Sequence, residues 1–298
     1  MRLQKEYIHM NSLKEKRVTQ ITLDEDFIVP DTQPDIAELI LDSGEIELEE
    51  TRNSGERVLL RGRLRFAVLY QPAGGGRIQK LDGSVPFEEA VNLGEISDRD
   101  TLTVLWDVED LSAGIINSRK MSIRAIVTFT VQAEQIQDEE IAVNAEGEEP
   151  FDTMLRNYDL TQIAVKTRDT WRFREEVDLE NNRPNIHEML WKHLELRGWE
   201  TRPMDGALSI RGEFALFAVY AGEEEHIPVQ YVEKILPFSG TVELADCTEE
   251  MIPDVMVRLG KREMEEKPDF DGEMRAIGVD AVLELEIRLE VSMSSPSI

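Results

Sequence analysis

Residues 58–70 read VLLRGRLRFAVLY, and residues 208–220 read LSIRGEFALFAVY. In the first stretch, apolar side chains stand at nearly every second position, and the positions between them hold Arg61, Arg63 and Arg65. A period of two places the apolar side chains on one face of a β-strand and the arginines on the other. The second stretch has the same alternation 150 residues later. The sequence therefore predicts β-strands with one wet face, in two related copies.

A second phrase recurs at the same offset. Residues 31–40 read DTQPDIAELI and residues 181–190 read NNRPNIHEML. The core of this repeat motif is Pro34, Asp35 and Ile36 in the first copy and Pro184, Asn185 and Ile186 in the second. Small changes of offset confined to loops are typical of duplication followed by loop insertion. We therefore predict two modules, residues 1–147 and 148–298, offset by about 150, with a drift to 153 that pairs Met121 with Met274.

Each copy has the same pattern of elements. Further alternating strands are predicted at 121–131 and 281–291, with shorter ones at 45–50, 77–81, 85–92 and 101–109. Segments 34–41 and 184–197 are predicted to be helical, because a proline stands near the first turn with acidic residues beside it. Segment 152–166 fits either a helix or a pair of strands. The predicted fold class is mainly β: two tandem antiparallel β-sandwich-like modules, each with one or two short helices.

The charge balance excludes some partners. The chain has 61 acidic and 33 basic residues, for a net charge of −28. Such a surface repels phosphate backbones and anionic membranes, so no nucleic-acid partner is predicted. No run of 18 apolar residues occurs, so membrane insertion is not predicted either. The acidity serves solubility or complements a basic partner. With one cysteine, no intramolecular disulfide is possible, and a reducing compartment, the cytoplasm, is expected.

The search for chemistry predicts no catalytic residue, no cofactor-binding residue and no metal site. AGGGRIQ at 73–79 lacks the ending of a phosphate loop and lies between alternating strands, which predicts a hairpin turn. His187 and His193 are six residues apart, which is not the spacing of a helical metal pair. Cys247 stands among acidic residues, whereas a nucleophilic cysteine needs cationic neighbours. Outside the strand cores, the letters that recur are Pro34, Arg61-Gly62, Tyr70 and Pro86-Phe87, with Pro184, Arg211-Gly212, Tyr220 and Pro237-Phe238. These are turn and packing residues, so an enzyme is not predicted.

Several phrases resemble a known family. VPDTQPDIAELI, VLLRGRLRFAVLY, VPFEEAVNL and INSRKMSIRAIVTFTV are similar to the SPOCS (spore-coat-associated) domain of endospore-forming bacteria. The first copy, 20–132, resembles the domain more closely than the second, 170–291. In the second copy Glu180 replaces Pro30, Asn185 replaces Asp35, and FDGE replaces the Asn-Ser-Arg-Lys turn.

The resemblance implies a place and partners. SipL-like spore morphogenesis proteins carry several SPOCS repeats and then a LysM domain that binds the ATPase of the coat basement layer. Nothing like LysM appears before Ile298, so these residues are either part of a longer protein or a short member, and docking onto that ATPase would need a LysM domain absent here. The expected location is the mother-cell cytoplasm, at the forespore surface and in the spore coat. Proteins of the coat are the expected partners, and self-association into a homo-oligomer is left open.

Two functions compete, and neither implies a cofactor. The first is a non-enzymatic scaffold for spore coat or envelope assembly that acts through protein–protein contacts, with Arg61, Arg63 and Arg65 as the candidate interaction face. These arginines would equally pair with acidic neighbours across the sheet. The alternative is a glycan- or peptidoglycan-binding β module of the spore envelope. It needs an exposed aromatic platform, for which the candidates are Trp106, Trp191 and Trp199. A hydrolase would need a cleft with convergent polar groups.

Overall fold

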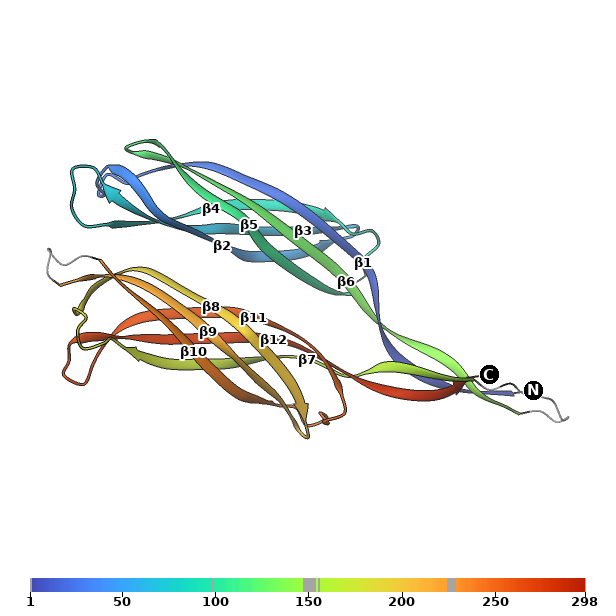
Figure 1. The fold of residues 1–298 in the computed structure, drawn as a ribbon. Coiled ribbons are helices and arrows are strands. Elements are labelled where there is room, and N and C mark those ends of the chain that lie inside the picture. Colours follow the sequence, from blue (N-terminus) through green and yellow to red (C-terminus); the bar gives the residue numbers. More distant parts are fainter. Residues whose placement is uncertain (1, 98, 147–153, 155, 224–228, 298) are drawn as a thin grey trace. The chain divides into compact units, whose positions relative to one another are not determined.

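The structure, a computed structural model, describes residues 2–97, 99–146, 154, 156–223 and 229–297. These residues form twelve β-strands and contain no helix (Figure 1). The first six strands are β1 (Arg2–Ile28), β2 (Ile36–Ser54), β3 (Arg57–Pro72), β4 (Gln79–Asn92), β5 (Thr101–Asn117) and β6 (Lys120–Glu146). The second six are β7 (Arg156–Asp178), β8 (Ile186–Met204), β9 (Ala207–Gly222), β10 (Gln230–Glu243), β11 (Ile252–Pro268) and β12 (Met274–Ser297).

Each set of six strands forms two three-stranded sheets. In the first module, β1 to β6, the sheets have the orders β2-β3-β4 and β1-β6-β5. In the second module, β7 to β12, they have the orders β8-β9-β10 and β11-β12-β7. The pairs made by β2, β3 and β4, the β5–β6 pair and all four pairs of the second module are antiparallel. The predicted tandem antiparallel β modules are confirmed.

The alternating strands fill one core in each module. Leu60, Leu64 and Val68 of β3 are fully buried in the first core. Their counterparts in β9, Ile210 and Phe214 among them, are buried in the second. Burial of these apolar faces between the two sheets of each module is the main stabilising term, at roughly 25 cal/mol per Å² removed from water. The arginines between the apolar residues of β3 stay on the outer face.

The predicted short helices are wrong, because segments 34–41 and 184–197 lie in strands β2 and β8 from Ile36 and Ile186 onward. Both strands contain irregularities. The register of β2 against β3 shifts at Ile36/Glu38, Leu39/Leu41 and Leu48/Glu50, and β8 shifts at three places against β9. An extra residue at a bulge breaks the period of two, so the apolar positions take on a helix-like spacing. Segment 152–166 is strand from Arg156 onward, and its earlier part lies largely outside the described residues.

The recurring Arg-Gly and Pro-Phe pairs form one packing feature. Gly62 lies opposite Phe87 in the β3–β4 register, and Gly212 lies opposite Phe238 in the β9–β10 register. A Cβ added to Gly62 would lie 2.3 Å from the carbonyl oxygen of Glu47 and 3.0 Å from Cζ of Phe87. The missing side chain therefore makes room for the opposite strand and for the aromatic ring that covers the glycine.

The predicted pairing of Met121 with Met274 is wrong. Met121 is fully buried, whereas Met274 is 39% exposed, because an odd offset such as 153 exchanges the two faces of a strand. Equivalent hydrogen bonds show which positions of the two modules correspond. The N–H of Val29 donates to the carbonyl oxygen of Arg119. Leu179 stands 150 residues after Val29, and its N–H donates to the carbonyl oxygen of Arg275. Arg275 therefore corresponds to Arg119, at an offset of 156.

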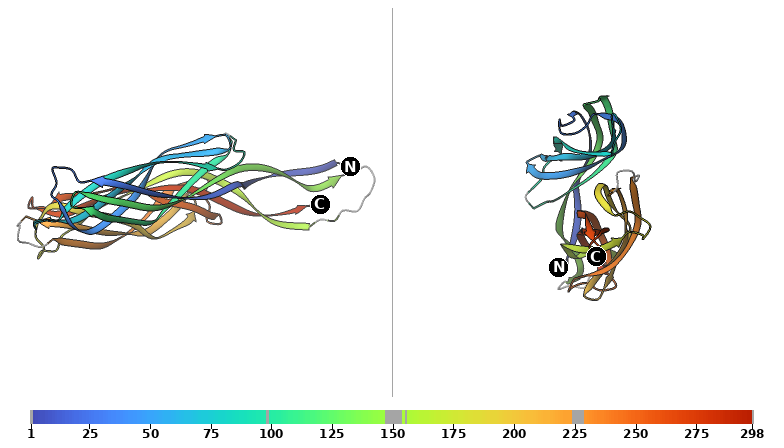
Figure 2. Two further views of the ribbon diagram at one scale, coloured as in Figure 1. Left: turned by 90° about the horizontal axis from the view of Figure 1, so that it is seen from above. Right: turned by 90° about the vertical axis from the view of Figure 1, so that its left-hand side faces the viewer.

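By contacts, the chain divides into two compact units. One is formed by residues 12–135, and the other includes residues 2–11, 136–146, 156–223 and 230–297. In the second unit, β7 and β12 stay paired as far as Arg156 and Ser297, and Figure 2 shows this pair continuing past the end of its sandwich. The predicted module boundary at residue 147 falls outside the described residues.

Candidate functional site

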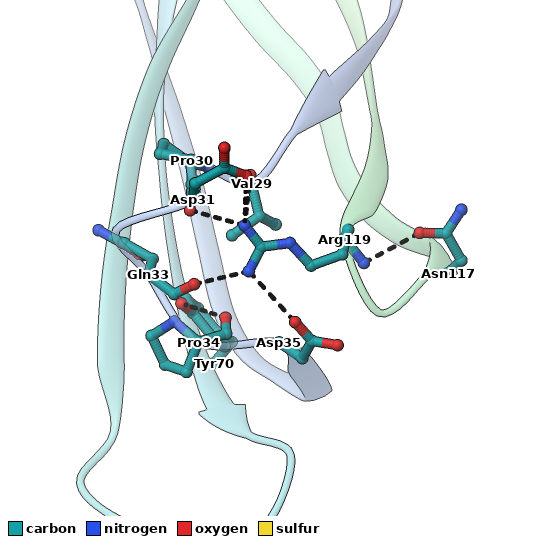
Figure 3. A network of polar contacts seen from close by, with 9 residues as sticks. All are labelled: Val29, Pro30, Asp31, Gln33, Pro34, Asp35, Tyr70, Asn117 and Arg119. Atoms are coloured by element: carbon teal, nitrogen blue, oxygen red, sulfur yellow. Dashed lines mark hydrogen bonds and ion pairs between the residues drawn. The ribbon is translucent and has the colours of Figure 1, made fainter.

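A single arginine holds the loop that carries the repeat motif in the first module. Arg119 lies in the turn between β5 and β6, and its guanidinium faces residues 29–35, which link β1 to β2 (Figure 3). It donates to the carbonyl oxygens of Val29 at 3.0 Å, Pro30 at 2.8 Å and Gln33 at 2.6 Å. It also reaches a carboxylate oxygen of Asp35 at 3.2 Å and of Asp31 at 3.4 Å. The planar fork of donors suits an arginine and not a lysine.

Main-chain bonds join the same two segments. The N–H of Val29 donates to the carbonyl oxygen of Arg119, and that of Ile36 donates to the carbonyl oxygen of Ser118. The N–H of Arg119 donates to Oδ1 of Asn117, which fixes the turn that presents the guanidinium. We call this arrangement of Arg119 and residues 29–35 the arginine clamp. It gives the carbonyl oxygens of Val29 and Gln33 a side-chain donor, and gives that of Pro30 a second donor besides the N–H of Gln33.

Tyr70 holds the clamped loop from the inside. Its side chain is fully buried, and its hydroxyl lies 3.1 Å from the carbonyl oxygen of Pro34 and 3.0 Å from Oε1 of Gln33. Burial raises the pKa of Tyr70, so the phenol keeps its proton and serves as a donor. Two recurring letters of the sequence, Pro34 and Tyr70, are thus in direct contact.

The second module has the same clamp on a different sequence. Arg275 donates to the carbonyl oxygens of Glu180 at 3.0 Å and Arg183 at 2.9 Å, and to Oδ1 of Asn185 at 2.9 Å. Tyr220 donates to the carbonyl oxygen of Pro184 at 3.2 Å. Burial raises the pKa of Tyr220 as well. The Asn-Ser-Arg-Lys turn is absent here, but its arginine is kept.

The sequence comparison missed Arg275 because it aligned the two methionines. A signal was available in the sequence. The alternation of apolar residues after Arg275 matches the alternation after Arg119 only at an even offset. An alignment of the positions predicted to be buried in the two strands, rather than of their identical residues, would have paired the two arginines.

The candidate face of Arg61, Arg63 and Arg65 is a ladder of ion pairs on the outer face of β2-β3-β4. Arg61 lies 2.8 Å from Glu88, Arg63 pairs with Glu49, and Arg65 lies 2.5 Å from Glu47. The hydrogen bond from Arg65 lowers the pKa of Glu47, which keeps this carboxylate ionised. All three arginines are more than 40% exposed at the side chain. Their role as an interaction face stays a prediction.

In the second module the positions of this ladder hold Arg211, Glu213 and Ala215. Arg211 lies 2.5 Å from Glu200. The inward positions of the two strands are therefore apolar in both modules, whereas two of the three ladder positions on the outer face change in charge. This contrast separates the core positions, which determine the fold of the module, from the positions on its outer surface.

Other candidate groups are dispersed. Within the described residues no group of three or more His, Cys, Asp and Glu side chains is arranged to hold a metal ion. Cys247 is buried. The AGGG segment is the turn between β3 and β4, and Gly74, Gly75 and Gly76 all have positive φ, so the predicted hairpin is confirmed.

The three tryptophans singled out for a glycan platform differ in their exposure. Trp106 packs against the first core, Trp191 is buried, and Trp199 of β8 is 38% exposed. In the part of the chain that the structure describes, no helix is long and apolar enough to span a bilayer.

A family model described as the SipL SPOCS domain matches residues 35–116 and residues 185–264. Together the two matches span more than half of the chain. The chain belongs to the SPOCS domain family. This family is a non-catalytic, sporulation-related one, and its two matches begin at equivalent positions, Asp35 and Asn185, inside the two clamped loops. Comparison with curated proteins and with solved structures gave no match.

Proposed function

We propose that this SPOCS protein is a scaffold for assembly of the spore coat or envelope and acts through protein–protein contacts made by the outer faces and edges of its modules. The observation that carries the proposal is the contrast between the two copies. The clamp and the core recur, whereas two of the three outward ladder residues change: Arg63 becomes Glu213 and Arg65 becomes Ala215, while Arg61 recurs as Arg211. A common frame with divergent surfaces suits a protein that presents different binding faces.

Two binding faces on one chain gain affinity from their linkage. Once one module is bound, the other is held near its own site at a raised effective concentration, so weak contacts add up to stable assembly. The proposed site of action is the mother-cell cytoplasm, at the forespore surface and in the growing coat. The proposed partners are coat proteins, and the basement-layer ATPase would be reached through a LysM domain that these residues do not contain.

The proposal is tested in sporulating cells with a fluorescent fusion of the chain and with affinity purification of its partners. We expect a ring of fluorescence around the forespore and co-purification of coat proteins. Even staining of the mother cell throughout sporulation, with no coat protein retained, contradicts the proposal. Retention on purified peptidoglycan would favour the glycan-binding alternative.

The arginine ladder gives a sharper arm of the same test. Charge reversal at Arg63 and Arg65 is compared with Arg57→Glu, a reversal at an exposed arginine on the same strand. If the ladder is the contact, only the double variant loses coat proteins. Unchanged retention with an intact fold removes this face from the proposal and leaves the sheet edges.

A further inference from the structure

The outer face of sheet β8-β9-β10 carries exposed apolar side chains at one edge. In β10, Leu236, Phe238 and Val242 point into the core, so Tyr231, Glu233 and Ile235 point outward. Tyr231 is 55% exposed and Ile235 is 46% exposed. Phe217 of β9 lies opposite Glu233, and its ring centroid is 6.3 Å from that of Tyr231. An exposed apolar patch of this kind is typical of an interaction site.

Tyr231 is held in place before any partner arrives. The guanidinium of Arg183 lies over its ring at 5.8 Å from the centroid and also donates to Oε1 of Gln230 at 3.0 Å. Arg183 belongs to the clamped loop of the second module, where the first module has Gln33. A side chain fixed by its neighbours loses little conformational entropy on binding.

The main chain of β10 is suited to accept another strand. Among the described residues its only neighbour is β9, and the register runs from Gln230 opposite Tyr220 to Glu243 opposite Ala207 without a shift. Pro237 lacks an N–H and fits an edge strand only where that group would point away from the sheet. By the period of two, Tyr231, Glu233 and Ile235 therefore turn their N–H and C=O groups toward the open edge.

The first module lacks this patch. The registers place Lys80 of β4 where β10 has Tyr231, because they lie opposite Leu69 and Val219. By the same registers Ser84 stands for Ile235 and Ala67 for Phe217. The fold is built equally well with polar or small residues here, so the apolar set is not needed for the core.

We propose that the open edge of β10 binds an extended segment of a partner protein by strand addition, with Tyr231 and Ile235 contacting apolar side chains four positions apart in that segment and Glu233 contacting a basic residue midway between them. This inference rests on the proposed scaffold function and names the edge of β10 as one of its binding sites. Main-chain bonds supply affinity in such complexes, and the alternate side chains supply specificity.

Charge selects the partner. Glu233 stands between the two apolar residues, and Glu213 of β9 lies on the same outer face of the sheet. A second copy of the chain would place Glu233 opposite itself whenever Tyr231 meets Ile235, and each copy brings a net charge of −28. A basic segment avoids both costs.

The probe is the acetylated and amidated peptide Lys-Val-Thr-Lys-Thr-Val-Lys, titrated against the full chain by calorimetry. In an antiparallel pair, valines beside Tyr231 and Ile235 point their N–H groups at β10, and the central lysine lies opposite Glu233. Methylation of the main-chain nitrogens of the valines should therefore abolish binding, whereas methylation of the main-chain nitrogens of the threonines should not. Amide hydrogen exchange of Tyr231, Glu233 and Ile235 should slow at least tenfold in the bound state.

The matched variant exchanges the patch for the residues of the first module, Tyr231→Lys with Ile235→Ser, and should weaken binding at least tenfold. The control Ser84→Ala in β4 should leave binding unchanged. A urea-unfolding curve confirms that the exposed exchange keeps the fold. Equal binding of both methylated peptides, unchanged binding of the double variant, or no binding of the unmethylated peptide each overturns the inference. In those cases a forespore ring of the fluorescent fusion would still support the proposed scaffold.

Discussion

The loops at residues 29–35 and 179–185 have different sequences and the same arginine clamp. In both, most of the arginine's partners are main-chain carbonyl oxygens. Carbonyls are present whatever the side chain, so Pro30 can become Glu180 without loss of the clamp. The one side-chain partner that the two loops share, Asp35 or Asn185, offers an Oδ1 in either form. The comparison teaches that the position of the arginine donors identifies this fold better than residue identity in the loops does.

An ion pair between the first and last strands of each module makes the same point with reversed charges. In the first module Arg124 of β6 donates to Asp24 of β1 at 2.6 Å. At the equivalent positions of the second, Asp280 of β12 accepts from Arg174 of β7 at 3.2 Å. The acidic and the basic residue have exchanged strands between the two modules, and the attraction between them is kept. A change at only one of the two positions would have lost it.

The largest expected difference between the modules is at their recurring glycines. Gly62→Ala pushes a Cβ against the carbonyl oxygen of Glu47, which is backbone, and should destabilise the first module by about 3 kcal/mol. At Gly212 the nearest atoms are Cζ of Phe238 at 2.9 Å and Cα of Trp199 at 3.0 Å, so the overlap with backbone is smaller and Gly212→Ala should cost about 1–2 kcal/mol. Urea unfolding of both variants checks this order. Equal losses would mean that the ring and not the backbone sets the cost.

The clamps should come next. Arg119→Ala removes the side-chain donor from the carbonyls of Val29 and Gln33 and one of the two donors from that of Pro30, and should cost about 2–3 kcal/mol. Arg275→Ala should cost a similar amount in the second module, and Arg57→Ala, at an exposed position of β3, should cost almost nothing. Because a lysine lacks the planar fork, Arg119→Lys should recover less than half of the loss. Full recovery in urea unfolding would show that charge alone holds the loop.

The tyrosines that support the loops should have a smaller effect. Tyr70→Phe and Tyr220→Phe each remove one buried donor and should cost about 1 kcal/mol. Tyr70 has Gln33 as a second acceptor within reach, so its loss should be the larger of the two. Thermal unfolding measures the difference. A larger loss at Tyr220 would contradict the view that both tyrosines hold their loops by hydrogen bonds and that Tyr70 has the additional acceptor.

The reversed ion pair predicts the smallest effect, and one that depends on pH. Hydrogen bonds from Arg172, and then from Arg174, lower the pKa of Asp280 from 3.8 to about 2. Because the folded-state pKa is the lower one, the stabilisation is present above about pH 4 and is lost as the pH falls through about 2. Asp280→Asn should flatten the dependence of stability on pH in this window. Urea midpoints between pH 2 and 5 measure it, and an unchanged slope would assign the acid response to other carboxylates.

The β architecture and the duplication could be predicted because strands such as 58–70 alternate without interruption. The bulged strands could not. Spacing around Ile36 and Leu39 resembles a helix when an extra residue interrupts the period, and only pairing with β3 reveals the bulges. The recurrence of Pro34 and Tyr70 predicts a structural role for both. Their mutual hydrogen bond and the clamp were beyond the sequence, since Arg119 acts on a loop 90 residues earlier.

The pairing of β1 with β6 and of β7 with β12 joins the two ends of each module. During synthesis on the ribosome, the opening strand of a module waits for about a hundred further residues before its partner emerges. Each SPOCS module is thereby an all-or-nothing unit, and shortened chains that stop inside one should leave an unmatched first strand prone to aggregate. Experiments that dissect this protein should cut between modules and never within them.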